Sequence, residues 1–182
     1  SSGDENVLLG NLLSGNGVGM LVGGAPDDRP RARHTRIGGN IVGGTLGGGT
    51  IPNRAGGVLI DGADDTVLAP APVTENGPDV PNLFQGNLGN YAIGVVARGT
   101  GGVRNVIRKG VFTGNVGPSI RHLDADHPGQ PPAGVPGAPV LLHSLVENDQ
   151  LHARVMPQAT GPVDVYLSQN CVGGIAQGFH VL

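Results

Sequence analysis

Short apolar runs recur along most of the chain, and each run is closed by glycine or asparagine. The opening segment shows the pattern most clearly, because Asn6, Asn11 and Asn16 stand at five-residue intervals with apolar residues between them. Runs this short do not form stable hairpins, and their spacing leaves no room for helical crossovers. The pattern therefore predicts short strands that are joined by tight bends, with no helices.

The same unit returns several times, and this repetition predicts a solenoid. Later copies start at Thr35, Gly57, Asn82 and Asn105. Asparagine and glycine tolerate the positive φ that such bends require, and asparagines at one position of successive coils can stack their amides in a hydrogen-bonded ladder. From Asn82 to Asn105 is 23 residues, and we interpret this distance as one coil with three short strands.

The succession of asparagine, apolar run, Gly-Asn and second apolar run resembles the repeat of right-handed parallel β-helices. More narrowly, it is similar to the β-helical repeats of large secreted or surface-attached bacterial proteins. The resemblance covers about residues 6–123 and implies an all-β fold, with a right-handed parallel β-helix (solenoid) over residues 1–126. It does not select a function, because this superfamily contains polysaccharide lyases, glycoside hydrolases, phage tailspikes and adhesins.

A second region follows a change in composition. Residues 127–139 contain five prolines and read as a linker, and beyond them apolar and polar residues alternate as in half-buried antiparallel strands. Residues 140–182 resemble part of the small β-sandwich that often follows such β-helices, with Cys171 a few residues after a Val-Asp-Val-Tyr strand. This antiparallel β-sandwich-like region either has an open sheet edge or lacks residues, and an open edge would accept a strand from another chain.

Composition and charge exclude several classes of protein. The 34 glycines and 15 prolines would suggest disorder, but 50 Val, Leu, Ile and Phe residues are enough to form a core. The net charge of −3 lacks the basic surplus of a nucleic-acid-binding protein. No apolar run is long enough to span a membrane, and a single cysteine cannot form an internal disulfide.

Two segments interrupt the repeat with Pro, Asp and Arg residues, namely 26–34 and 69–81. Loops on the edge of a solenoid often form binding surfaces. The alternative is inserted length that the surface tolerates.

The best candidate for a metal site is the pair Asp124 and Asp126, with Arg121, His122 and His127 beside it. These residues alternate along a segment that we expect to be extended, so the two carboxylates could face the same side and share a calcium ion. The alternative is a polar cap at the end of the β-helix. The sequence thus assigns no catalytic residue and no cofactor other than this calcium ion.

Further candidates are weaker. Asp61, Asp64 and Asp65 lie in a glycine-rich turn, where aspartate commonly accepts hydrogen bonds from the backbone. Arg108 and Lys109 replace the Gly-Asn that we expect in that coil, and such cations could contact an acidic sugar or be neutral. The glycine-rich segment 43–49 is no phosphate-binding loop, because it lacks the lysine and the following helix, and we assign it to coil turns.

The leading hypothesis is a noncatalytic extracellular structural or adhesive protein of the cell surface. Self-association through coil ends and an open strand edge would build fibres or a surface layer. The alternative is a carbohydrate-active protein, resembling a polysaccharide lyase or hydrolase, or a carbohydrate-binding protein. The small number of aromatic residues speaks against this alternative, since sugar rings usually pack on flat apolar side chains.

Overall fold

The computed structural model describes residues 3–23 and 31–127, together with the strand backbone of the C-terminal region. Residues 26–30 of the first interruption and residues 128–139 of the expected linker lie outside this description. Every regular element in the described residues is a β-strand, so the expected all-β class is confirmed. No helix among these residues is long and apolar enough to cross a membrane.

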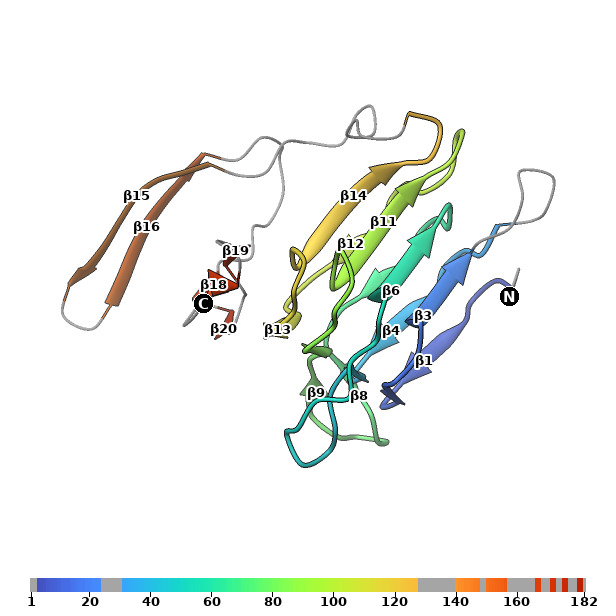
Figure 1. Cartoon of the computed structure of the whole chain (residues 1–182), viewed down its shortest axis with the longest axis horizontal. Coiled ribbons are helices and arrows are strands. Elements are labelled where there is room, and N and C mark those ends of the chain that lie inside the picture. The colour runs from blue at the N-terminus through green and yellow to red at the C-terminus, as the bar shows by residue number, and fades with distance from the viewer. Residues whose placement is uncertain are drawn as a thin grey trace.

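Three parallel sheets of four strands each make up the main body (Figure 1). Sheet I contains β1 (Val7–Leu9), β4 (Arg36–Gly38), β7 (Val67–Leu68) and β12 (Val106–Ile107). Sheet II contains β2 (Leu12–Leu13), β5 (Ile41–Val42), β10 (Leu83–Gln85) and β13 (Val111–Thr113). Sheet III contains β3 (Val18–Gly23), β6 (Gly56–Asp61), β11 (Ile93–Ala97) and β14 (Ile120–Asp124).

The chain visits sheets I, II and III in this order four times. We call each visit a pass, and the four passes are residues 4–23, 33–61, 64–97 and 103–124. All strand pairs between neighbouring passes are parallel and in register. Each pass therefore packs its side chains onto the equivalent side chains of the next pass.

The expected coil of 23 residues is wrong. Equivalent asparagines of the third and fourth passes, Asn87 and Asn115, are 28 residues apart, and those of the first and second passes, Asn11 and Asn40, are 29 apart. Asn82 precedes a strand of sheet II whereas Asn105 precedes a strand of sheet I, so these two occupy different corners of the structure.

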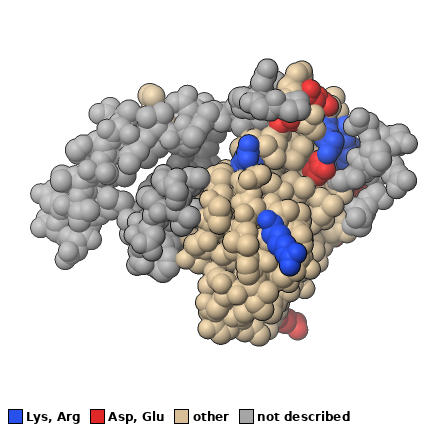
Figure 2. Space-filling view, viewed as in Figure 1, with Lys and Arg blue, Asp and Glu red and all other residues tan. Residues whose placement is uncertain are grey.

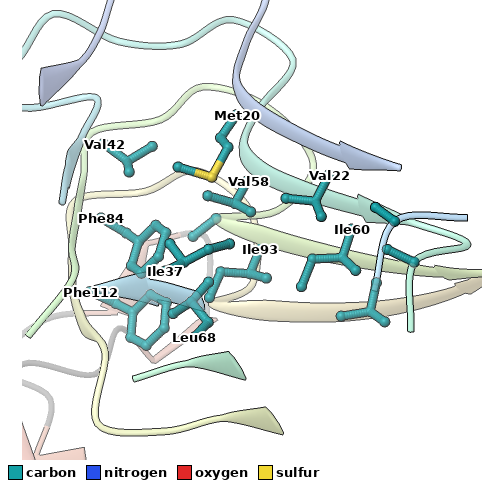
Figure 3. Close-up of a cluster of buried hydrophobic side chains, with 14 residues drawn as sticks. Met20, Val22, Ile37, Val42, Val58, Ile60, Leu68, Phe84, Ile93 and Phe112 are labelled. Carbon is teal, nitrogen blue, oxygen red and sulfur yellow. The ribbon is translucent and has the colours of Figure 1, made fainter. Parts of the chain in front are cut away.

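Apolar side chains stack in columns between the three sheets and form the core (Figure 3). One column contains Val42, Phe84 and Phe112, and the two phenylalanine rings stack with their centroids 5.0 Å apart. A second column, in sheet III, contains Met20, Val58 and Ile93. Each fully buried side chain of this size stabilises the fold by roughly 1.5–3 kcal/mol, so four short passes can form a core.

Asparagine ladders connect the passes at two corners. Corner A lies between sheets I and II, and there Asn11 Nδ2 donates to Asn40 Oδ1, and Asn40 Nδ2 donates to Asn82 Oδ1, both at 3.0 Å. Corner B lies between sheets II and III and holds Asn16, Asn53, Asn87 and Asn115. Here Asn53 Nδ2 donates to Asn87 Oδ1 at 2.9 Å, and Asn87 Nδ2 donates to Asn115 Oδ1 at 2.8 Å. The expected amide ladder is therefore present.

The ladder of corner A ends at Gly110. The strand register places Gly110 opposite Asn82. It gives Lys109 the position that Gly39 occupies in the second pass. Lys109 keeps the positive φ of that position, 49° against 63° for Gly39. The expectation that Arg108 and Lys109 replace Gly-Asn is thus wrong by one residue, because Lys109 and Gly110 do so.

Two insertions leave the repeat. The expected loop at 69–81 contains the antiparallel hairpin β8 (Ala71–Pro72) and β9 (Asp79–Val80), which explains the 42 residues between Asn40 and Asn82. Segment 43–49 also belongs to a loop rather than to a tight coil turn, since Gly44 and Thr50 form an antiparallel bridge. That second insertion was not predicted.

In the C-terminal region, the described strands pair in an antiparallel manner, as the alternating sequence predicts. The longest pair is β15 (Val140–Glu147) with β16 (Gln150–Met156). The others are β17 (Tyr166–Leu167) with β20 (His180–Val181), and β18 (Cys171–Val172) with β19 (Ile175–Ala176). The side chain of Cys171 lies outside the described part.

Candidate functional site

Charged side chains gather at the third corner, corner C, which lies between sheet III and sheet I. Four non-glycine residues with positive φ align there in successive passes: Glu5 at 58°, His34 at 52°, Asp65 at 54° and Arg104 at 56°. The repeated left-handed backbone turns the chain into sheet I at the same place in every pass. It also places acidic and basic side chains in one column at the surface.

Asp65 and Arg104 form the closest ion pair of this column. Arg104 Nε and Nη2 donate to the two carboxylate oxygens of Asp65 at 2.6 and 2.7 Å. These bonds lower the pKa of Asp65 below its ordinary value of 3.8, and His34 and Arg33 add a smaller effect in the same direction. The pair joins the third pass to the fourth.

The two other aspartates of the predicted glycine-rich cluster also contact the next pass. Asp64 is buried, and its Oδ1 accepts hydrogen bonds from the backbone N–H groups of Gly102 and Val103 at 3.0 and 3.1 Å. Asp61 accepts two hydrogen bonds from the guanidinium of Arg98. The expected role in backbone satisfaction is therefore confirmed for Asp64, whereas Asp61 and Asp65 pair with arginines.

Asp126 reaches the same region from the other predicted cluster. Its Oδ2 accepts the backbone N–H of Gly99 at 2.7 Å, in the turn that follows β11. Arg31 lies on this turn as well, since its guanidinium donates to Thr100 Oγ1 at 3.1 Å and to the Arg98 carbonyl at 3.4 Å. The structure thus brings both acidic clusters onto one segment, residues 98–104. Figure 2 shows acidic and basic side chains side by side here, on a surface that otherwise carries little charge.

Asp124 and Asp126 do not lie on one extended segment, so that expectation is wrong. Strand β14 ends at Asp124, and the chain bends over residues 125–127. Asp124 Oδ1 accepts the N–H groups of Asp126 and His127 at 2.8 and 3.0 Å, and Asp124 Oδ2 lies 3.2 Å from His127 Nδ1. Partial burial raises the pKa of Asp124, but these bonds from His127 and Asp126 outweigh it and lower the pKa overall.

The remaining members of the predicted metal cluster point to different sides. In β14, Arg121 pairs in register with Gly94 and His122 with Val95, and neighbouring residues of a strand face opposite sides. Within residues 3–23 and 31–127, no group of three His, Cys, Asp or Glu side chains is placed to hold a metal ion. Calcium binding by Asp124 and Asp126 stays a prediction.

The first pass forms a second candidate surface. Asn11 and Asn16 are exposed, whereas their counterparts Asn40, Asn53 and Asn87 are fully buried. Beside the exposed strand edges lies a hollow of about 190 Å³, lined among others by Leu8 and Val22. Among the described residues, strands β1, β2 and β3 pair on one side only. Their other edges carry backbone groups that can pair with a further strand.

The sequence did not indicate Arg31, Arg98 or Arg104 as members of the charged corner. Arg98 and Arg104 lie 37 and 39 residues after their aspartate partners, a distance of one pass, and the register that would reveal this spacing is not readable from the sequence. Comparison with protein-family models, curated proteins and solved structures finds no match to this chain, so the arrangement of its own side chains carries the functional argument.

Proposed function

We propose that this protein is a noncatalytic structural or adhesive protein of the cell surface or the extracellular space. In this proposal each pass is one coil of a right-handed parallel β-helix, and the antiparallel C-terminal strands belong to a β-sandwich-like region. The protein would associate with itself, or with a surface partner, through the end of the stack and through an open strand edge.

One observation carries the proposal: the carboxylates that could have served catalysis bind neighbouring passes to each other instead. Asp65 pairs with Arg104 of the following pass. Asp61 and Asp64 bind the turn between the third and fourth passes, through the guanidinium of Arg98 and the backbone N–H of Gly102. Asp126 binds the same turn through the backbone N–H of Gly99. A general acid or base needs an oxygen that can reach a substrate proton, and these oxygens are occupied by structural donors.

The three aromatic side chains that the structure describes support the same proposal over carbohydrate binding. Phe84 and Phe112 are buried in the core, and Tyr91 is only 9% exposed. A Cβ at Gly56 would lie 2.4 Å from the Tyr91 ring, so this ring packs against the backbone of sheet III. The three rings therefore offer little flat surface for stacking with a sugar.

Self-association is supported by the exposed edge of the first pass. Apolar side chains surround that edge, and Leu12 and Leu21 are 48% and 55% exposed. A strand edge with apolar neighbours tends to pair with another chain unless charged residues interrupt it. The two-stranded β15–β16 ribbon offers further open edges, within the strands that the structure describes.

Sedimentation velocity over a range of protein concentrations, combined with electron microscopy, tests the proposal. We expect concentration-dependent association and fibres or sheets. The variant Leu12→Lys should weaken association because it places a charge beside the edge, whereas the control Leu46→Lys changes an exposed leucine of the 44–50 loop and should associate normally. Uniform monomers together with no attachment to cell surfaces would contradict the proposal.

The carbohydrate-active alternative has its own test. Acidic and neutral polysaccharides are incubated with the protein and with its Asp124→Ala and Asp126→Ala variants, and the products are analysed for cleavage. We expect no cleavage by any of the three proteins. Cleavage that is lost in the two variants would overturn the noncatalytic proposal.

A further inference from the structure

The chain contains two Asn-Gly pairs, Asn16-Gly17 and Asn76-Gly77. The structure places the two pairs in different surroundings, which should give them different chemical reactivity. Asparagine followed by glycine is prone to spontaneous deamidation, because no Cβ of the next residue shields the backbone nitrogen that attacks the amide. On sequence grounds the two pairs are equivalent. Both asparagines are exposed.

Gly17 presents an open nucleophile. A Cβ built on Gly17 would have no atom within 4 Å, and no acceptor for the Gly17 N–H is found among the described residues. The side chain of Asn16 makes one hydrogen bond, from Nδ2 to the carbonyl of Ser14 in its own pass, at 3.1 Å and at the surface. Asn16 therefore has little to hold its amide away from the Gly17 nitrogen.

Gly77 is shielded. Its N–H donates to the Thr74 carbonyl at 3.0 Å, and a Cβ at Gly77 would lie 2.4 Å from Thr74 Oγ1. The attacking nitrogen of this pair is thus occupied and crowded within the loop between β8 and β9. Deprotonating and moving it would require the local turn to open first.

The ladder asparagines of the inner passes are protected in a different way. Asn87 Nδ2 donates to the carbonyl of Val42 and to Asn115 Oδ1, and Asn87 Oδ1 accepts from Asn53. Asn87 is also followed by Leu88, whose side chain shields the nitrogen. Only the open first pass combines an exposed ladder position with a following glycine.

From this contrast we propose that Asn16 is a site of spontaneous deamidation in the folded protein. The Gly17 nitrogen loses its proton and attacks Cγ of Asn16, a C–N bond forms, and Nδ2 leaves as ammonia. Water then opens the resulting succinimide at either carbonyl and gives aspartate or isoaspartate. The step needs no oxidant, reductant or cofactor, and it adds one negative charge to corner B of the first pass.

The product changes the pairing of the first pass. Arg54 N donates to the Asn16 carbonyl at 2.9 Å, and Ala55 N donates to the Gly17 carbonyl at 2.7 Å. In isoaspartate the main chain runs through Cβ and Cγ of residue 16, which lengthens it by one methylene, and the former Asn16 carbonyl becomes part of a free carboxylate. Both hydrogen bonds therefore cannot keep their geometry. Deamidation would therefore weaken the pairing of the first pass with the second, and this loss would progress slowly as the protein ages.

Peptide mass mapping of the dilute 182-residue chain tests this inference. The folded protein is aged in mildly alkaline buffer, and tandem mass spectrometry locates the mass gain of deamidation. We expect Asn16 to convert at least tenfold faster than Asn76 in the folded protein, and both to convert at similar rates when the chain is aged in denaturant. Equal rates in the folded protein, faster conversion of Asn76, or no conversion of Asn16 while the denatured chain converts would each overturn the proposal.

Two variants serve as controls. Gly17→Ala fits the open space at that position and should slow the conversion of Asn16 several-fold without altering the fold. Asn16→Gln should remove the fast mass gain from the first peptide. Because the protein is dilute and the readout is chemical, this result is independent of whether the protein self-associates.

Discussion

Corners B and C solve the same geometric problem with different chemistry. Both turn the chain from one sheet to the next in every pass. Corner B uses neutral amides, and Asn53, Asn87 and Asn115 are fully buried there. Corner C uses a column of charged residues at the surface, and its ladder positions include Thr35 and Thr66 in place of asparagine.

The difference follows from the free-energy cost of removing each kind of side chain from water. An amide carries both donors and acceptors, so a column of asparagines can satisfy itself inside the protein. Burying a charged side chain is expensive unless hydrogen bonds compensate for the lost water, as two backbone N–H groups do for Asp64. Corner C keeps the Asp65–Arg104 ion pair at the surface. Among its buried groups in the described structure, Thr66 Oγ1 has no hydrogen-bond partner.

The largest effect is expected from breaking corner B at its centre. Asn87→Ala removes a side chain that hydrogen-bonds to both neighbouring passes, and it leaves several buried groups unsatisfied. We expect a loss of about 3–4 kcal/mol in the free energy of unfolding, measured by denaturant titration. The matched control Asn16→Ala lies on the exposed end of the same ladder and should cost under about 0.5 kcal/mol. Similar losses for both variants would show that the burial of the ladder does not matter.

A second prediction concerns glycines with the same backbone conformation in different surroundings. Gly43 follows β5 near corner B with a φ of 84°, and a Cβ there would lie 2.4 Å from the Gln85 carbonyl. Gly48 has a φ of 81° in the 44–50 loop, with no atom within 4 Å of such a Cβ. We expect Gly43→Ala to cost about 3 kcal/mol and Gly48→Ala about 1 kcal/mol in thermal or chemical unfolding. Equal losses in the two variants would show that backbone conformation alone determines the loss of stability, and that the close packing of passes does not contribute.

A substitution at Thr66 is expected to stabilise corner C. Thr66→Val replaces a buried hydroxyl that lacks a partner by a methyl group of similar size, and we expect a gain of up to about 1 kcal/mol in the free energy of unfolding. Thr35→Val is the control, because Thr35 Oγ1 accepts a long hydrogen bond of 3.5 Å from Asn6 Nδ2. This control should be neutral or slightly destabilised. A clear loss of stability in Thr66→Val would mean that the hydroxyl has a partner.

The smallest effect is expected from the ion pair of Asp65 and Arg104. Arg104 lowers the pKa of Asp65, so the folded state favours the carboxylate more than the unfolded state does. This contribution is present above the ordinary pKa of 3.8 and is lost as the pH falls through the lower value of the folded protein. The pair is at the surface, so the contribution is small. Unfolding measured across this acidic range should lose stability less steeply in Asp65→Asn than in the parent, and identical profiles would contradict the assignment.

The sequence predicted the strands, the bends and the amide ladder because these depend on local patterns that recur. It did not predict the length of a pass, since asparagine marks all three corners and nothing local distinguishes Asn82 at corner A from Asn105 at corner C. The charged corner was only half predicted. The sequence predicted Asp61 and Asp65 as members of one acidic cluster. It did not predict their partners Arg98 and Arg104, which lie 37 and 39 residues later and are brought close only by the strand register.

The extended geometry expected for Asp124 and Asp126 is wrong for a related reason. Alternation along a strand assumes that the strand continues, and Asp124 ends β14 by accepting hydrogen bonds from the two N–H groups that follow. Such a local bend competes with an extended strand, and the sequence does not show which one is favoured.

Native-state hydrogen exchange of individual backbone amides tests the central claim most directly, namely that buried asparagine ladders hold the passes together. The N–H groups of Asn40 and Asn87 donate to the amide oxygens of Asn82 and Asn115 at 3.1 and 3.0 Å. We predict that these two amides exchange only when the whole stack unfolds, and that the Gly17 amide exchanges many orders of magnitude faster. Exchange of Asn40 and Asn87 as fast as that of Gly17 would contradict the account.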